Sequence, residues 1–239
     1  MSQSSSTPEL SLKYLTRPPR TEAAGKPPLL LQLHGIGSNE HDLFSFADRL
    51  DPHFRVLSLR APLALPTGGF AWFEVTFQPQ GNVANVEQLR AARERLLQFI
   101  QEAVAAYDAD PERVYLIGFS QGAIMSLTLA LTSPAVVAGV VAMSGRIPTE
   151  AFDAFQWTAP DDKLTGLPIL LLHGTRDAVI RVQHAHLARN LLEKLPVTLT
   201  YHEYDMAHEV MPRSLALAVA WLMARLNEPR RQGEPALGV

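Results

Sequence analysis

A single serine stands between two glycines in the stretch LIGFSQG, at residues 116–122. The run RVYLIGF is apolar and rich in β-forming residues, and QGAIMSLTLAL has the composition of a helix that ends near Pro134. A strand that turns abruptly into a helix leaves little room at the turn, so glycines on both sides of Ser120 suit it. This context predicts a nucleophilic Ser120 more strongly than the alternative, an ordinary serine in a tight turn.

A nucleophilic serine needs a base that removes its proton and an acid that orients the base. In sites built on a strand–turn–helix, the partners follow in the chain order serine, acid, histidine. Asp177 follows the run LPILLLHG and His208 follows VTLTYHEYDM, so both are predicted to lie with Ser120 at the carboxyl edge of a parallel sheet. The alternatives are that Asp177 caps a turn or helix and that His208 caps the last helix. Asp205 is the second choice for the acid.

Backbone N–H groups are the expected partners of the negative oxygen that develops when an acyl carbon is attacked. One donor is the N–H of Gln121, directly after the serine. The other is expected in LHGIGSNEHDL, where Gly35 and Gly37 allow a turn that directs the N–H of Ile36 toward the site. The alternative for this loop is a flexible turn at a strand end.

The other histidines receive weaker assignments. His34 and His173 each end an apolar run, and we expect them to be structural or to support the site from behind. His184 and His186 lie two residues apart on a predicted helix, so they point to different sides and no metal site is expected there. His202, within a predicted strand, is expected to be structural.

These residues need a scaffold that brings distant segments to one edge. Apolar runs with little alternation predict strands buried on both faces at residues 29–35, 54–60, 113–119, 136–145, 167–174 and 197–204. The more alternating run 11–16 predicts an edge strand, and amphipathic patterns predict helices at 84–107, 181–195 and 213–226. Because strands and helices alternate, we expect an α/β fold with a mostly parallel central sheet and helices on both faces.

The composition restricts the class of protein. The chain has 239 residues, a net charge of −3 and no cysteine, and 47% of its residues are hydrophobic. Disulfides, thiolate nucleophiles and zinc–thiolate sites are thereby excluded, and no basic stretch predicts nucleic acid as a partner. The sequence has neither an apolar run of about 18 residues nor the pattern of a signal peptide, so we expect a cytoplasmic protein.

One domain is expected, at residues 9–226. The Ser-rich segment 1–8 predicts a disordered tail, and the Pro-, Gly- and charge-rich segment 227–239 predicts a flexible one. We find no linker and no repeat between the two segments.

Six motifs occur in an order typical of one family: LHGIGSNEHDL, RAPLALPTGGFAWFE, GFSQGAIMSL, MSGRIP, LLHGTRDAVI and YDMAHEV. Through them the sequence, over about residues 25–226, resembles the phospholipase/carboxylesterase family of α/β-hydrolases. That family includes acyl-protein thioesterase-like enzymes and bacterial carboxylesterases. The resemblance implies the α/β-hydrolase fold and a catalytic triad of Ser120, Asp177 and His208. It also implies that Ile36 and Gln121 occupy the oxyanion positions.

The substrate side of the site is predicted less directly. The resemblance implies that Trp72 lies near the substrate entrance, and the alternative is a structural plug. Leu65 and Phe70, in the same stretch, are candidates for lining an acyl groove, and the aromatic-rich segment 146–166 is a candidate rim or cover. Core packing is the alternative for both. One departure from the family pattern is Arg181, where a proline often stands in the loop after the aspartate.

The leading hypothesis is a serine carboxylesterase that cleaves short-to-medium acyl esters through an acyl-enzyme on Ser120. No metal or cofactor is expected. Thioesterase or lysophospholipase activity is the alternative within this class, and a non-catalytic binding module or an enzyme for peptides or lactones is more distant. The expected partner is a small-molecule acyl ester, with no nucleic acid and no stable membrane insertion. A homodimer would agree with the family resemblance.

Overall fold

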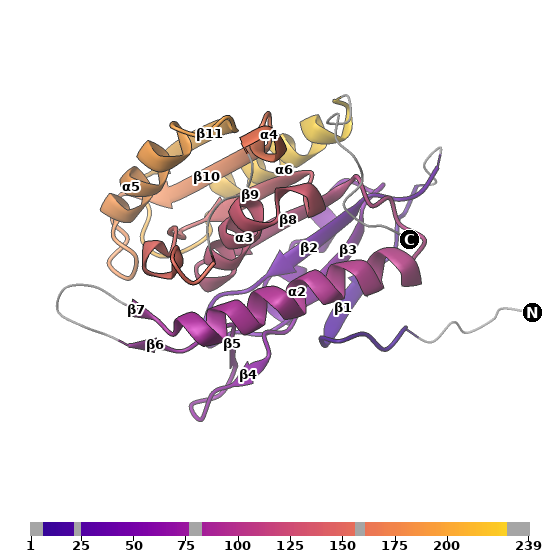
Figure 1. Ribbon diagram of the computed structural model, residues 1–239. Coiled ribbons are helices and arrows are strands. Elements are labelled where there is room, and N and C mark those ends of the chain that lie inside the picture. Colours follow the sequence, from indigo (N-terminus) through magenta and orange to yellow (C-terminus); the bar gives the residue numbers. More distant parts are fainter. Residues whose placement is uncertain (1–6, 22–24, 77–82, 156–160, 229–239) are drawn as a thin grey trace, which may run out of the picture.

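A central sheet of seven strands organises the computed structural model, which describes residues 7–21, 25–76, 83–155 and 161–228 (Figure 1). Its strands, in spatial order, are β1 (Tyr14–Arg17), β3 (Arg55–Leu59), β2 (Leu29–Leu33), β8 (Val114–Phe119), β9 (Gly139–Met143), β10 (Pro168–Gly174) and β11 (Thr198–Tyr204). Only β1 is antiparallel to its neighbour in this sheet. The predicted mostly parallel sheet is confirmed, and the predicted edge strand is β1.

Helices cover both faces of the sheet, as predicted (Figure 1). One face is covered by α2 (Val86–Ala106), α3 (Gln121–Thr132) and α5 (Val182–Leu192). The other is covered by the short α1 (His41–Phe44) and by α6 (Pro212–Leu226). The smaller elements are η1 (Ala47–Arg49), η2 (Pro134–Val136), η3 (Thr149–Ala151), α4 (Asp161–Leu164) and two hairpins, β4 (Leu63–Ala64) with β5 (Phe70–Ala71) and β6 (Val75–Thr76) with β7 (Val83–Ala84).

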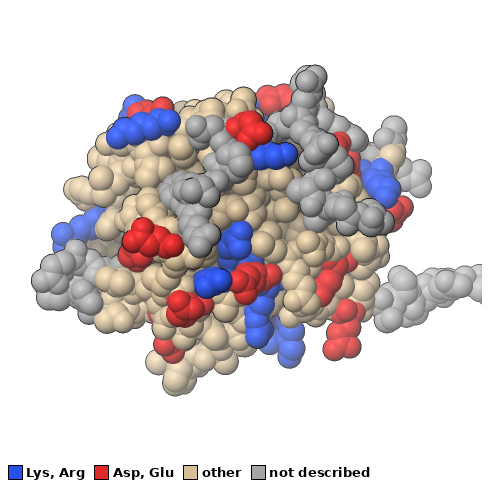
Figure 2. Space-filling model, in the orientation of Figure 1, with Lys and Arg blue, Asp and Glu red and all other residues tan. Residues whose placement is uncertain are grey.

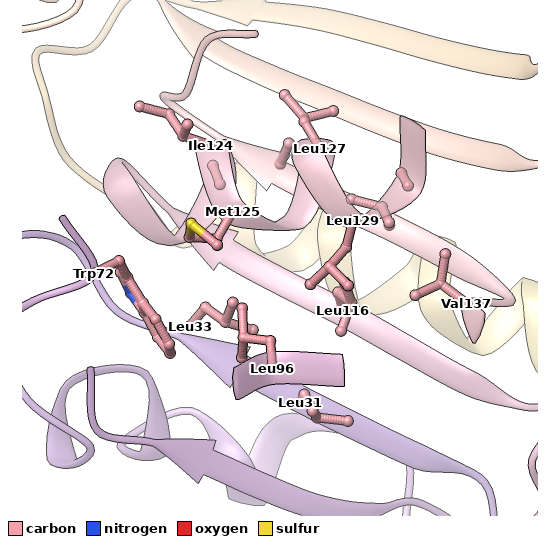
Figure 3. Close-up of a cluster of buried hydrophobic side chains, with 14 of the residues drawn as sticks. Leu31, Leu33, Trp72, Leu96, Leu116, Ile124, Met125, Leu127, Leu129 and Val137 are labelled. Carbon is pink, nitrogen blue, oxygen red and sulfur yellow. The ribbon is translucent and has the colours of Figure 1, made fainter. Parts of the chain in front are cut away.

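The central strands are apolar along their whole length because they are buried on both sides. In β2, Leu31 packs in the core beneath α2 and α3, whereas Leu30 packs in the core beneath α1 and α6. The same division separates Leu116 from Ile117 in β8. Figure 3 shows the first of these cores, with Leu31, Leu33 and Leu116 below the side chains of α3. Each such leucine stabilises the fold by roughly 2 kcal/mol.

The loops after the parallel strands open at one edge of the sheet. The loop after β2 carries Ile36, the turn after β8 carries Ser120, and the loops after β10 and β11 carry Asp177 and His208. The parallel pairing of β2, β8, β9, β10 and β11 is therefore what collects these residues at one edge.

Neither the exposed charged side chains nor the two ends of the chain contribute a residue to the predicted site. On the face shown in Figure 2, the described acidic and basic side chains are interspersed, without a large area of one sign. Among the described residues, no helix has the length and apolar composition needed to cross a bilayer. The predicted tails lie almost wholly outside the described residues, so the predicted domain bounds stay predictions. The cytoplasmic location and the homodimer also stay predictions.

Candidate active site

The turn around Ser120 is as sharp as its sequence predicts. Ser120 has φ 54° and ψ −117°, a backbone conformation that residues other than glycine rarely adopt. A Cβ on Gly118 would lie 2.3 Å from the carbonyl oxygen of Gly122, and a Cβ on Gly122 would lie 1.9 Å from that of Leu33. The carbonyl of Ser120 accepts the first bond of α3, from Ile124 N–H at 3.0 Å. Both glycines are thus required by the close approach of strand, turn and helix.

The three residues of the predicted triad meet at this turn. His208 Nε2 lies 2.9 Å from Ser120 Oγ, and His208 Nδ1 lies 2.7 Å from Asp177 Oδ2. A carboxylate only accepts hydrogen bonds, so Nδ1 carries the ring proton and Nε2 is free to accept the serine proton. Ser120 and Asp177 are buried, while the side chain of His208 is 17% exposed. The imidazole therefore has access to solvent or substrate.

Asp177 is held by its own loop. Its Oδ1 accepts the backbone N–H groups of Val179 at 2.9 Å and Ile180 at 2.8 Å. The carbonyl of Ile180 accepts a hydrogen bond from His173 Nε2 at 2.7 Å, and this Nε2 lies 3.5 Å from Asp177 Oδ2. Burial lowers the pKa of His173, so the ring is neutral near pH 7. The alternative that Asp177 caps a turn is also correct, because one carboxylate oxygen caps while the other meets His208.

The remaining alternatives for the acid and the base are not what the structure shows. Asp205 is exposed and forms an ion pair with Arg176. The last helix, α6, begins at Pro212 with Met211 as its N-cap, so His208 is not its cap.

The loop after β2 packs against Ser120. A Cβ on Gly35 would lie 3.2 Å from Ser120 Cβ, which places the Gly35–Ile36 peptide next to the serine. Gly37 has φ 80°, and its N–H donates to Phe70 O at 2.9 Å. The side chain of Ile36 is 41% exposed, so this residue borders the open side of the site. The loop is hydrogen-bonded to the β4–β5 hairpin, unlike a flexible turn.

The family model described as Phospholipase/Carboxylesterase matches residues 20–225. This chain belongs to that family. Esterase YpfH of Escherichia coli is 30% identical to it over 217 residues, which are 87% of each chain. Acyl-protein thioesterase 1 of Kluyveromyces lactis is 29% identical over 180 residues, covering 70% of this chain and 76% of that protein. A solved carboxylesterase of Bacillus cereus, at 24% identity, shares the fold with a TM-score of 0.76 over 90% of this chain and 94% of that one.

In this member of the phospholipase/carboxylesterase family, Trp72 is a core residue. It is 1% exposed, its indole N–H donates to His34 O at 3.0 Å, and its ring lies beside Leu33 in Figure 3. Trp72 thus packs in the core beside His34, and its place near a substrate entrance stays a prediction. Leu65 and Phe70 are half-buried in or beside the β4–β5 hairpin, and their lining role stays a prediction.

The side chain of Gln121 has a role that the sequence interpretation missed. Its Oε1 accepts the backbone N–H of Trp72 at 2.9 Å, and its Nε2 donates to Phe73 O at 2.6 Å. The Gln121 side chain thereby links the turn at Ser120 to the segment that carries Trp72. The available signal was a long polar residue at the start of an otherwise apolar helix.

The first part of segment 146–166 packs on α3, and residues 156–160 lie outside the described part of the chain. Arg146 pairs with Glu150, whose Oε1 accepts Ala84 N–H at 3.1 Å. Burial raises the pKa of Glu150, but Arg146 and the backbone N–H donors, Ala84 among them, together hold that pKa below its usual value. A small apolar pocket lies here, lined by Thr128, Leu131, Thr132, Ile147, Pro148, Phe152 and Phe155. The role of the segment as a rim or cover stays a prediction.

His184 and His186, for which the sequence predicts no metal site, lie near charged side chains. His186 Nε2 lies 2.7 Å from Glu203 Oε1, on the side of β11. Burial and the nearby Arg146 lower the pKa of His184. In the described residues, no group of three potential ligand side chains has the arrangement of a metal site.

Proposed function

We propose that this chain hydrolyses carboxylic esters through an acyl-enzyme on Ser120. The observation that carries the proposal is the continuous pair of hydrogen bonds from Asp177 through His208 to Ser120, at 2.7 and 2.9 Å. A serine, a neutral imidazole and a carboxylate in this order are the parts that acyl transfer requires. Membership of the phospholipase/carboxylesterase family supports the same chemistry.

In the first half-reaction, Ser120 Oγ attacks the acyl carbon while His208 Nε2 takes its proton. The carbonyl oxygen becomes negative, and the backbone N–H groups of Ile36 and Gln121 would donate to it. When the tetrahedral intermediate collapses, His208 returns the proton to the leaving alkoxide. The alcohol departs and the acyl group stays bound to Ser120 as an ester.

In the second half-reaction, water replaces the alcohol. His208 removes a proton from the water as its oxygen attacks the acyl-enzyme, and the same N–H groups receive the second oxyanion. Collapse then breaks the bond to Ser120, which regains its proton from His208, and the carboxylic acid leaves. Asp177 stabilises the imidazolium that forms in each half and keeps the Nδ1–H tautomer.

A thioester is the second candidate substrate. Acyl-protein thioesterase 1 of Kluyveromyces lactis is among the relatives, and the same triad chemistry would release a thiol in place of an alcohol. The sequence has no basic cluster for a phospholipid headgroup, so we favour short-to-medium acyl substrates over phospholipids. The sequence does not separate esters from thioesters. A series of acyl chain lengths with oxygen and sulfur leaving groups ranks the two candidates.

The deciding experiment compares the wild-type chain with Ser120→Ala. The wild type should hydrolyse an aryl ester and should be labelled on Ser120 by a fluorophosphonate. Ser120→Ala should lose both, with little change in its melting temperature, because only one oxygen is removed from a folded turn. Hydrolysis that persists in Ser120→Ala would identify another nucleophile and contradict the proposal.

A further inference from the structure

The His34 ring holds the peptide that carries the second oxyanion donor. His34 Nδ1 lies 2.7 Å from Gly35 O, and His34 Nε2 accepts the backbone N–H of Ala61 at 3.0 Å. A backbone N–H can only donate, so Nε2 carries no proton. The ring proton therefore resides on Nδ1, where it is donated to Gly35 O.

This bond orients the N–H of Ile36 as well. Gly35 C=O and Ile36 N–H belong to one planar trans peptide, so the N–H points away from whatever holds the carbonyl. Gly35 O also accepts Ser38 N–H, at 3.2 Å. Two donors thus fix the carbonyl on one side of the peptide plane, and the direction of the Ile36 N–H follows.

The ring is enclosed in a way that keeps this arrangement. His34 is 1% exposed, and burial lowers its pKa, so the ring is neutral near pH 7. The Trp72 ring lies 5.9 Å from it between centroids, and the indole N–H donates to His34 O. Main-chain and side-chain atoms of His34 are therefore both held, and the tautomer is determined by Ala61.

We propose that His34 is a positioning residue of the oxyanion site, which orients the Gly35–Ile36 peptide so that Ile36 N–H meets the developing oxyanion. The inference rests on the proposed function, since that oxyanion forms only when Ser120 attacks an acyl carbon. His34 touches no reacting atom and acts through the main chain. Loss of one oxyanion donor typically lowers kcat by about 10²–10³.

Two substitutions separate this role from simple packing. In His34→Asn, the amide nitrogen takes the place of Nδ1 and donates to Gly35 O. In His34→Gln, the longer amide reaches the place of Nε2 and the donor to Gly35 O is lost. We expect His34→Gln to lower kcat at least about 10-fold with KM within about 2-fold, because the bond to the oxyanion exists only in the transition state. His34→Asn should stay within about 3-fold of the wild type.

The exposed His202 supplies the matched control, since His202→Gln should leave kcat unchanged. Phosphonylation of Ser120 should slow in parallel with kcat in His34→Gln. Equal losses of kcat in His34→Asn and His34→Gln, or a loss that appears in KM alone, would overturn the inference.

A second measurement needs no variant. Long-range ¹H–¹⁵N NMR spectra of the wild-type chain report which nitrogen of His34 is protonated. A protonated Nδ1 is expected, and a protonated Nε2 overturns the inference even if His34→Gln fails to fold. A wild type that shows the Nδ1–H tautomer but neither cleaves the ester nor reacts with the fluorophosphonate overturns the proposed function, and the positioning role of His34 with it.

Discussion

Gly122 and Leu33 meet backbone to backbone, at a point where a Cβ on residue 122 would lie 1.9 Å from the carbonyl oxygen of Leu33. The turn that carries Ser120 thus packs directly on β2, the strand that leads into the loop with Ile36. Because the atoms on both sides belong to the backbone, no change of rotamer relieves an added side chain. This contact fixes Ser120 and the loop that carries Ile36 relative to each other.

Gly122→Ala should therefore destabilise the fold strongly. The added methyl group forces β2 and the turn apart, so we expect a loss of at least about 2–3 kcal/mol or a failure to fold. Denaturant unfolding measures this. The control is Gly139→Ala, whose Cβ would have side-chain atoms of Tyr115, Pro168 and Trp221 as its nearest neighbours, none closer than 3.2 Å, so a shift of a few tenths of an ångström relieves the contact. Similar losses in the two variants would contradict the contact described here.

Asp177→Asn should lower kcat by about 10⁴-fold, because an amide in place of the carboxylate favours the wrong tautomer of His208 and no longer stabilises the imidazolium. Stability should change less, since the amide oxygen can still accept the N–H groups of Val179 and Ile180. Steady-state hydrolysis of an aryl ester checks the first expectation. Asp205→Asn, at the exposed second-choice acid, should stay within about 2-fold, and a large loss there would reopen the choice of acid.

Trp72→Phe should lower kcat about 10-fold, because the bond to His34 O beside the oxyanion loop is lost. Trp221→Phe is the matched control. Its indole N–H donates to Thr200 Oγ1 at 3.3 Å, in the core on the α6 side of the sheet. Both variants should lose about 1–2 kcal/mol of stability, measured by denaturant unfolding, but only the first should lose turnover. If Trp72→Phe instead raises KM with kcat unchanged, the indole contacts substrate.

The stability of the fold should fall in mild acid. Burial lowers the pKa of His34, His173 and His184 in the folded chain. Below pH about 6.5 these histidines therefore bind more protons in the unfolded chain than in the folded chain. The free energy of unfolding should be constant above that pH and decrease as the pH falls toward the lowered values. Denaturant unfolding at pH 7.5 and at pH 5 tests this, and His34→Asn should show a shallower decrease. A wild-type unfolding free energy that does not change between the two pH values would contradict the neutral, buried rings.

The sequence interpretation succeeded where one short segment carries the whole signal. The turn itself requires glycine at 118, where a Cβ would meet the carbonyl oxygen of Gly122, whereas glycine at 122 is required by the contact with β2. The chain order of serine, acid and histidine limits the partners of Ser120. The sequence left two alternatives open for Trp72, because an aromatic residue in a Gly- and Pro-rich loop has the same local pattern whether it lines an entrance or fills a core. The structure shows that the residue is 1% exposed and packed in the core, and its contact with substrate stays a prediction.

The sequence by itself determined the alternation of strands and helices, the strained turn at Ser120 and the family to which the chain belongs. These follow from local composition and from motifs that each lie within a few residues. Only the tertiary structure decided that His208 meets Asp177 and not Asp205, that Gln121 ties the turn to Trp72, and that the proton of His34 lies on Nδ1. Each of those depends on distances between segments far apart in the chain, and such distances are set by strand order and core packing.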